Sequence, residues 1–293
     1  MNVETKKRTG EASPFPVLAG IVLYEPEEER LMENLAAVLP QVQHVLLVDN
    51  HSSCLSRIRA RVVEQFGEER LMWLFLDENK GIAYALARIM DYACGQGFPW
   101  VLTLDQDSVC RPGLVEQYFC LTGQPEIGQM GCRITDRNFT EPGLTEGDGA
   151  EYQEVPFVIT SGSFMNVKWY QKTAGYDEKM FIDGVDVDIS YALRKAGAKV
   201  IRIPFDGLLH EVGHGKPVKL LGKEYIAYQH SPERNYYIAR NNQYLQRKYP
   251  TEFSRIHTFL YELRMELVIG LYEDQRWEKL KNRWKGIRDS RKM

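Results

Sequence analysis

Short apolar runs and amphipathic stretches alternate along the first third of the 293-residue chain. Each run is rich in Val, Leu and Ile and too short for a helix, which predicts strands buried on both faces. The stretches between them carry apolar residues at helical spacing, which predicts helices with one face against a core. The alternation predicts an α/β fold with a Rossmann-like, mostly parallel central sheet covered by helices on both faces. Strands are expected at 17–24, 44–50, 71–76 and 101–104, and helices at 25–39, 55–66 and from residue 79 onwards.

The remainder of the chain carries shorter strand signals and then a long helical end. An acidic segment at 181–189 leads into a helix that Gly197 ends. The glycine-rich segment 135–150 is interpreted either as a mobile flap or as a plain surface loop. Also expected are a helix at 112–121, a strand at 127–134, two short strands within 155–167 hinged at Ser161-Gly162-Ser163, and helices at 231–249, 252–272 and 275–291. The predicted organisation is a polar tail over 1–16, an α/β domain over 17–230 with halves at 17–110 and 111–230, and a helical extension over 231–293.

Polar side chains gather where the expected strands end. In an open α/β sheet, ligands bind outside the carboxyl ends of the strands, so this clustering indicates a binding site. Asp105 and Asp107 point the same way if the backbone stays extended, and both can then face one divalent cation whose other ligands are water and substrate phosphate. The alternative is that these acids are solvated turn residues or helix caps. The strand-end residues are Asp49, Asp77, Asn79, Asp105 and Asp107.

Composition excludes several classes of protein. With 37 basic and 40 acidic residues, the chain has no overall positive charge that would favour nucleic acid. Its 5 cysteines lack paired short spacings, which indicates reduced thiols in a cytosolic protein. The first sixteen residues lack the apolar stretch of a signal peptide, and no run of about 18 apolar residues occurs that would span a bilayer.

Two common phosphate-binding motifs are missing. Acidic residues at 25–29 follow the first strand, where a dinucleotide fold has Gly-X-Gly-X-X-Gly. A loop of the Gly-X4-Gly-Lys-Ser/Thr type is also absent from the sequence. Phosphates are therefore expected to be held by a cation.

The segment from His210 to His214 matches the zinc-protease pattern His-Glu-X-X-His. That pattern needs a helix to place both imidazoles on one face. Glycines and prolines on both sides of the segment predict a loop instead, so a zinc hydrolase is disfavoured and a single histidine acting as a ligand or phosphate contact is favoured. These residues are Pro204, Gly207, Gly213, Gly215 and Pro217.

The C-terminal segment 276–293 is basic and carries Trp277 and Trp284. One interpretation is a helix that rests on an anionic membrane surface. The alternative is a solvated helix that packs its tryptophans on the main domain.

An ordered set of motifs resembles family 2 glycosyltransferases of the GT-A fold, and within them the rhamnosyltransferases that build bacterial surface polysaccharides. The resemblance covers roughly residues 17 to 250. It departs from the family at Val185-Asp186, where Glu-Asp is frequent, and at Gly184, where the subgroup often has a bulkier residue. The motifs are Val22, Tyr24 and Pro26, VDNHS at 48–52, NKGIAYA at 79–85, TLDQDS at 103–108, SGS at 161–163, FIDGVDVDISYALRKAG at 181–197, LLHEVGH at 208–214 and YYIARN at 236–241.

The resemblance implies a role for individual residues. Asp49 would accept a hydrogen bond from the ring N–H of the base, Asp105 would face the ribose or a metal, and Asp107 would hold Mg2+ or Mn2+ against the diphosphate. His210 would complete the metal or phosphate shell, and Arg240 would contact the diphosphate or acceptor. The other implied positions are Tyr24, Asn79 and Gly81 for the nucleotide sugar and Ser161, Gly162 and Ser163 for the acceptor.

The chemistry of glycosyl transfer requires a group that takes a proton from the acceptor hydroxyl. The acids at 183–188 supply candidates, because capping of a helix accounts for one of them but not for three. We expect Asp186 to be the base, with Asp183 second, and Asp188 to orient the loop. One base without a covalent nucleophile implies a single displacement with inversion.

The sequence thus predicts an inverting, metal-dependent transferase that moves L-rhamnose from dTDP-rhamnose to a glycan or lipid-linked acceptor, at the cytoplasmic face of the membrane. Alternatives are a transferase for another UDP- or dTDP-sugar, a nucleotidyltransferase or phosphohydrolase, and a non-catalytic subunit that binds a nucleotide sugar.

Overall fold

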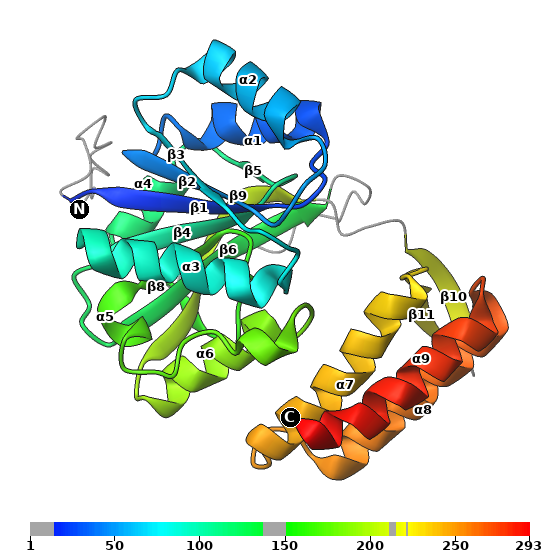
Figure 1. The fold of residues 1–293 in the computed structure, drawn as a ribbon. Helices are drawn as coiled ribbons and strands as arrows, with labels where there is room; N and C mark the ends of the chain where they lie inside the picture. The colour runs from blue at the N-terminus through cyan, green and yellow to red at the C-terminus, as the bar shows by residue number, and fades with distance from the viewer. Residues whose placement is uncertain (1–14, 137–150, 211–214, 221) are drawn as a thin grey trace.

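The computed structural model describes residues 15–136, 151–210, 215–220 and 222–293, with the backbone alone at Asp136 and His210. The first apolar runs form parallel strands whose carboxyl ends lie at one edge of the sheet (Figure 1). The strands are β1 (Val17–Leu23), β2 (His44–Asp49), β3 (Leu71–Phe75) and β4 (Trp100–Asp105). The helices between them are α1 (Glu28–Val38), α2 (Leu55–Phe66) and α3 (Gly81–Gln96).

The second half of the domain extends the sheet with strands of both directions. The strand order is β3-β2-β1-β4-β8-β6-β9-β5, and β7 pairs with β9. β8 runs antiparallel to β4 and β6, whereas β9 runs parallel to β6. The additional elements are β5 (Val109–Cys110), α4 (Leu114–Phe119), β6 (Ile127–Asp136), β7 (Gln153–Glu154), β8 (Ser163–Asn166), α5 (Val167–Tyr170), a 3-10 turn at Glu178–Met180, α6 (Val185–Lys195) and β9 (Lys199–His210).

Side chains of β1 alternate between two apolar cores, as the period of a strand requires. Ile21 and its same-face neighbours pack with α1, α2 and α4, whereas Leu18 packs with α3, α5 and α6. Figure 1 shows α1 and α2 on one side of the sheet and α3 and α6 on the other. The predicted α/β fold with a largely parallel sheet between helices is confirmed.

Two local predictions are wrong. Residues 155–160 are not a strand, because Pro156 cannot donate to a sheet ladder; only β8 forms after the turn at Gly162. The loop expected around His210 does not include Pro204 and Gly207, since β9 runs through both of them to His210; residues 211–214 lie outside the described residues. β9 tolerates this proline because its register against β6 shifts there, between the pairs formed by Gly131 and Arg133. Of the expected flap or loop at 135–150, residues 137–150 lie outside the described residues.

The helical end forms as predicted and is joined by a hairpin that the sequence did not reveal. Ser231 caps the first of these helices by accepting a hydrogen bond from the Arg234 N–H at 3.1 Å, with Pro232 in the first turn. The helices are α7 (Pro232–Lys248), α8 (Arg255–Tyr272) and α9 (Arg276–Asp289), followed by a 3-10 turn at Ser290–Lys292. The hairpin of β10 (Lys216–Leu220) and β11 (Lys223–Ala227) belongs with them, since the Tyr272 hydroxyl donates to the Lys219 carbonyl at 2.5 Å. We call α7 to α9 with this hairpin the C-terminal module (Figure 1).

Candidate active site

A cleft of about 880 Å3 opens at the carboxyl ends of β1 and β4. Its walls come from the start of α3, the segment 181–186 and the start of α7, so regions far apart in sequence meet here. The sequence-predicted residues that line it are Tyr24, Asn79, Gly81, Asp105, Asp107, Ser161, Asp183 and Asp186. The expected convergence of strand-end acids with the second acidic cluster is therefore observed.

Asp105 and Asp107 stand at the end of β4 and in the turn that follows. The strand end is held by Ser161, whose hydroxyl accepts the Asp105 N–H at 3.0 Å, and by Asn34, whose amide donates to the Asp105 carbonyl at 2.7 Å. Ser161 in turn donates to the hydroxyl of Ser108 at 2.7 Å. These contacts fix the direction in which the turn presents its carboxylates.

The donor set in the cleft fits a hard divalent cation that is shared with a substrate. Among the side chains that the structure describes, no group of three His, Cys, Asp or Glu residues forms a ready cation site. Mg2+ in phosphoryl-handling enzymes is held by only one or two carboxylates together with substrate phosphates, and Asp105 and Asp107 provide such a pair. β9 pairs Leu209 with Val109, which brings the backbone of His210 beside the turn that carries Asp107.

Asn50 and Asn79 hold the start of α3 against the cleft. The Asn50 amide donates to Asn79 Oδ1 at 2.9 Å, and Asn50 Oδ1 accepts the Lys80 N–H at 2.9 Å. Asn79 Oδ1 also accepts the Gly81 N–H at 3.0 Å. Asn50 lines the cleft and was not predicted as a site residue, although it follows the expected strand end at Asp49.

Asp49 lies beneath the cleft rather than on its wall. Its Oδ2 accepts hydrogen bonds from the backbone N–H groups of His51 at 3.1 Å and Ser52 at 3.0 Å. Over the described part of the chain, its Oδ1 is buried and accepts no hydrogen bond. A buried carboxylate oxygen without a donor is a position where the N–H of a ligand lowers the free energy.

The segment from Phe181 to Gly184 has a strained backbone. Phe181, Asp183 and Gly184 have φ values of 63°, 65° and 78°, and the first two are not glycines. Such conformations persist where surrounding contacts enforce them, and they gather at functional sites. Here the Asn241 amide donates to the carbonyls of Met180, Ile182 and Asp183 at 2.7 to 2.9 Å.

Arg240, for which the motif implies a contact to the diphosphate or acceptor, supports the same segment and is not among the residues that line the cleft. Its guanidinium donates to the carbonyls of Lys179 at 2.7 Å and Met180 at 2.8 Å. The side chain also stacks over the ring of Tyr237. Those contacts place Arg240 behind the cleft wall, where it orients the acidic segment.

Asp183 and Asp186 occupy different electrostatic environments. Arg234 donates to both carboxylate oxygens of Asp183 at 3.0 to 3.3 Å, which keeps that carboxylate paired. Asp186 lies in the first turn of α6, where its carboxylate accepts the Val187 N–H at 2.8 Å. Burial, and after it the negative charges of Asp183 and Asp105, raise the pKa of Asp186 to about 6. A carboxylate with this pKa accepts a proton more readily than an ordinary aspartate.

Residues on the C-terminal module complete the cleft, and sequence reasoning missed them. His230 and Arg234 reach it from the start of α7, and Tyr228 precedes them. Burial and the charge of Arg234 lower the pKa of His230, which favours the neutral imidazole. The Ser231-Pro232 helix start was visible in the sequence, but nothing local indicates that it lies opposite Asp183.

Of the three residues in the turn predicted to bind the acceptor, Ser161 reaches the cleft and the next two lie in the interior. Ser161 lines the cleft, whereas Ser163 is fully buried and accepts a hydrogen bond from the Gln129 amide at 2.9 Å. The carbonyl of Gly162 accepts from the buried Tyr118 hydroxyl at 2.6 Å. Gly162 and Ser163 therefore lie beneath Ser161 and do not line the cleft.

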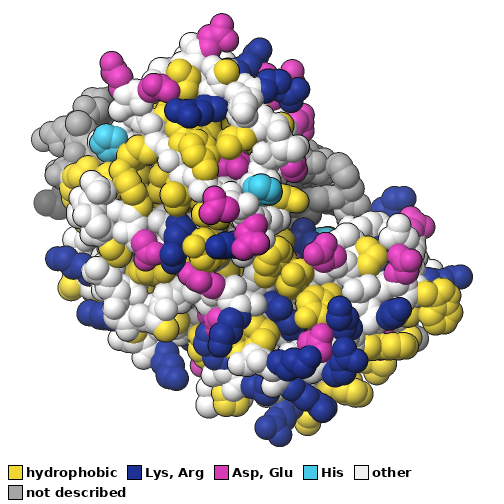
Figure 2. Space-filling model, in the orientation of Figure 1, with side chains coloured by type: hydrophobic (Ala, Val, Ile, Leu, Met, Phe, Trp, Pro, Cys, Tyr) yellow, Lys and Arg dark blue, Asp and Glu magenta, His cyan; other side chains and the backbone are white. Residues whose placement is uncertain are grey.

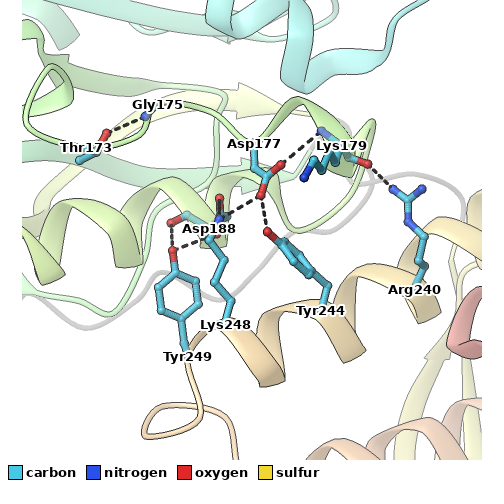
Figure 3. Close-up of polar contacts among 9 residues, drawn as sticks. All are labelled: Thr173, Gly175, Asp177, Lys179, Asp188, Arg240, Tyr244, Lys248 and Tyr249. Atoms are coloured by element: carbon cyan, nitrogen blue, oxygen red, sulfur yellow. Dashed lines mark hydrogen bonds and ion pairs between the residues drawn. The ribbon is translucent and has the colours of Figure 1, made fainter. Parts of the chain in front are cut away.

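Asp188 is anchored in a polar network between α6 and α7 (Figure 3). Lys248 bridges Asp188 at 2.8 Å and Asp177 at 3.1 Å, and the Tyr249 hydroxyl donates to Asp188 at 2.9 Å. Burial raises the pKa of Asp177, but hydrogen bonds from Tyr244 and Lys248 outweigh it, and the pKa is lowered. The network joins the C-terminal module to the helix that carries Asp186, in agreement with the orienting role expected for Asp188.

Replacing Lys248 with methionine is expected to lower the free energy of unfolding by about 2–3 kcal/mol, because Asp188 is only 1% exposed and would lose its charge partner. The matched control is Lys199→Met, which removes an exposed ion pair with Glu126 and should change stability by less than about 0.5 kcal/mol. Urea unfolding measures both. Equal effects of the two substitutions would contradict the importance of the network.

Gly81 allows α3 to approach the strained segment. Its φ is +82°, and a Cβ there would lie 2.5 Å from the Phe181 carbonyl oxygen. We expect Gly81→Ala to destabilise the protein by about 2–4 kcal/mol, through backbone strain and this clash. Gly97→Ala is the control, since Gly97 has a φ of +76° but no atom within 4 Å of an added Cβ. A melting temperature lowered equally by both would show that the contact with Phe181 is unimportant.

The comparison with known protein families shows to which family of proteins this chain belongs. A sequence profile described as glycosyl transferase family 2 matches residues 21–173, just over half of the chain. The chain belongs to glycosyl transferase family 2. The match includes β2, β3 and β4 and the acids Asp105 and Asp107, and it makes the chain a glycosyltransferase rather than a binding subunit.

Relatives within this family include rhamnosyltransferases. The chain is 27% identical over 266 residues to dTDP-rhamnosyl transferase RfbF of Shigella flexneri, covering 83% of this chain and 87% of the relative. It is 24% identical over 237 residues to N-acetylglucosaminyl-diphospho-decaprenol L-rhamnosyltransferase of Mycobacterium tuberculosis, covering 68% and 76%. The sequence similarity thus extends through most of both chains.

Solved structures of similar fold are GT-A glycosyltransferases. The mannosyltransferase PcManGT of Pyrobaculum calidifontis, solved with GDP-Man and Mn2+, matches with a TM-score of 0.58 at 14% identity over 95% of this chain and 75% of that one. TarS 1-349 of S. aureus with UDP matches at 0.56 and 13% identity over 94% and 91%. The GT-A fold expected from the motifs is confirmed. The described helices include none with both the length and the apolar character needed to cross a membrane.

Proposed function

We propose that this glycosyltransferase moves L-rhamnose from dTDP-rhamnose to a glycan or lipid-linked acceptor, with inversion at the anomeric carbon and with Mg2+ or Mn2+ as cofactor. The observation that carries the proposal is the single cleft that joins the Asp105 and Asp107 pair to Asp186. Inverting transfer needs these two functions close together: charge stabilisation at the leaving diphosphate and a base at the attacking hydroxyl.

The donor assignment has support from both relatives and residues. One relative is named a dTDP-rhamnosyl transferase, and the other an N-acetylglucosaminyl-diphospho-decaprenol L-rhamnosyltransferase, a name that includes a lipid-linked acceptor. The buried Oδ1 of Asp49, which accepts no hydrogen bond from the described residues, suits the ring N–H of a thymine or uracil base, and Tyr24 and Asn79 line the cleft. Gly81 brings the start of α3 close to the same pocket.

We assign Asp107, together with Asp105, to the cation, and His210 remains a proposed additional ligand. A bound divalent ion supplies Lewis-acid stabilisation of the leaving diphosphate. The carboxylates hold that charge at the end of β4, and Ser161 and Asn34 keep the strand end in place. Two of the fold neighbours were solved with Mn2+ and a nucleotide or nucleotide sugar, which supports a divalent cation here.

Asp186 takes the role of general base in this proposal. It accepts the proton of the acceptor hydroxyl while the hydroxyl oxygen forms the new bond to the anomeric carbon and the bond to the diphosphate breaks. Arg234 holds Asp183 in an ion pair beside it, so we assign Asp183 to orienting the acceptor side of the cleft and place it second to Asp186 as a candidate base. The location that follows is the cytoplasmic face of the membrane, where lipid-linked acceptors are elongated.

Thermal unfolding with a panel of donors tests the assignment. A ligand at a hundredfold excess over its Kd stabilises the folded state by about 2.7 kcal/mol, so a true donor raises the melting temperature. We expect dTDP-rhamnose with Mn2+ to give the largest rise, above dTDP-glucose and UDP-N-acetylglucosamine. A larger rise with a UDP-sugar would contradict the donor assignment and leave the transferase assignment intact.

A further inference from the structure

Helix α8 carries an apolar stripe that faces solvent. Residues three and four apart in sequence lie on one face of a helix. Six large apolar side chains of α8 follow this spacing and therefore share one face. Monomeric soluble proteins seldom expose so continuous a patch. The stripe consists of Ile256 (71% exposed), Phe259 (65%), Leu260 (52%), Leu263 (44%), Leu267 (43%) and Leu271 (61%).

The opposite face of α8 is the buried one, and it carries an acid. Glu262 is 4% exposed and pairs with the fully buried Arg283 of α9. The Asn242 amide of α7 also donates to Glu262, at 2.9 Å. These paired polar groups fix α8 in an orientation that directs its leucines away from the rest of the molecule.

Helix α9 places tryptophans and cations beside the stripe. The Trp284 indole N–H donates to Glu266 of α8 at 2.9 Å, and the ring remains 56% exposed. Trp277 is 73% exposed, so neither tryptophan packs on the main domain, and that interpretation of the C-terminal sequence is wrong. A groove of about 520 Å3 is lined by Trp284 together with three cations, an acid and an amide: Lys281, Lys285, Arg288, Glu278 and Asn282.

The net charge of this region is positive. Segment 276–293 has eight Lys or Arg residues against two acids, and of these cations Lys279 and Arg283 are buried in ion pairs. Figure 2 shows Lys and Arg side chains gathered over the C-terminal helices. The exposed cations are Arg276, Lys281, Lys285, Arg288, Arg291 and Lys292.

An anionic bilayer surface is the occupant that matches all these features. Leucine and phenylalanine side chains enter the acyl boundary, tryptophans prefer the headgroup level, and lysines and arginines bind lipid phosphates. A second copy of the chain fits less well, because a two-fold contact on this face would bring the same cations of both copies together.

We propose that α8 and α9 form an interfacial docking surface for anionic phospholipid, with the α8 stripe inserted and the α9 cations on the headgroups. The surface is rigidly coupled to the cleft through α7, which supplies Arg234 to the cleft and packs so closely on α9 that a Cβ on Gly286 would lie 2.3 Å from the Tyr236 carbonyl oxygen. Docking therefore sets the height of the cleft above the bilayer. This inference deepens the proposed function and rests on it in one respect, the lipid-linked nature of the acceptor.

Co-sedimentation of the full chain with vesicles tests the docking surface. The chain is expected to sediment with phosphatidylglycerol-containing vesicles, to bind pure phosphatidylcholine far less, and to be released by high salt. Ile256→Glu with Phe259→Glu should weaken vesicle binding by roughly tenfold or more, since two inserted apolar side chains are lost. Phe75→Glu is the matched control, because Phe75 is 45% exposed on the edge strand β3 and should leave vesicle binding unchanged.

The variants are compared only where they keep the wild-type melting temperature, and Ile256→Glu alone replaces the double variant if that one does not fold. Failure of the wild-type chain to bind anionic vesicles overturns the inference. So does a dimer, detected by light scattering, that the substitutions convert to a monomer without vesicle binding. Vesicle binding without rhamnosyl transfer contradicts the proposed function alone, and transfer without vesicle binding contradicts this inference alone.

Discussion

Asp186→Asn is expected to reduce kcat by about a hundredfold to ten-thousandfold, the range that a positioned general base contributes. Asparagine keeps the size of the side chain and can still accept the Val187 N–H through its carbonyl oxygen, so the start of α6 should be preserved. It cannot take a proton from the acceptor. Steady-state kinetics with a fixed donor concentration and varied acceptor measure the loss.

The pKa of Asp186 adds two tests of the same assignment. A pKa of about 6 means that kcat/KM should fall about tenfold per pH unit below pH 6 and level off above it, because only the carboxylate accepts a proton. Since the pKa is raised in the folded state, ionisation costs stability above pH 6, and Asp186→Asn should keep or raise the melting temperature at neutral pH. Near-normal turnover of this variant would eliminate Asp186 as the base and return attention to Asp183.

Asp107→Ala is expected to lower kcat/KM by about a thousandfold, since it removes a proposed ligand of the cation that stabilises the leaving diphosphate. Excess EDTA should have a comparable effect on the wild-type enzyme, and Mg2+ or Mn2+ should reverse it. The matched control is Asp77→Ala, because Asp77 also follows a strand of the sheet but is not among the residues that line the cleft.

Full activity in excess EDTA would contradict the proposed requirement for a divalent cation. A loss for Asp77→Ala equal to that for Asp107→Ala would show that a general change of charge at the sheet edge, rather than ligation, reduces the rate.

The sequence revealed the fold wherever local pattern and tertiary burial agree. The runs that form β1 to β4 are apolar because helices cover both faces of the sheet. The change from apolar to polar residues therefore marks the strand ends in the sequence. β9 was hidden because Pro204 and Gly207 are ordinarily loop residues, and the irregular pairing with β6 that accommodates the proline is a tertiary feature. The β10 and β11 hairpin is polar and lies outside the main sheet, so it left no alternating apolar pattern.

The site was predictable where one short segment supplies the chemistry. Helix capping explains one acid in such a segment but not several, so the clustered acids could be recognised as site candidates. They are Asp105, Asp107, Asp183 and Asp186. Arg234 was missed because its role depends on the way α7 folds back on Asp183, 51 residues away. Arg240 was assigned to the ligand because a motif gives a residue's neighbours along the chain and not the direction of its side chain.

The most direct test of the account is a crystal structure of Asp186→Asn soaked with dTDP-rhamnose and Mn2+, in which the substitution protects the donor from turnover. The account predicts an anomalous manganese peak bonded to Asp107 and to the diphosphate, with the anomeric carbon of rhamnose turned toward residue 186. A nucleotide bound outside the cleft, or residue 186 on the diphosphate side of the sugar, would contradict it.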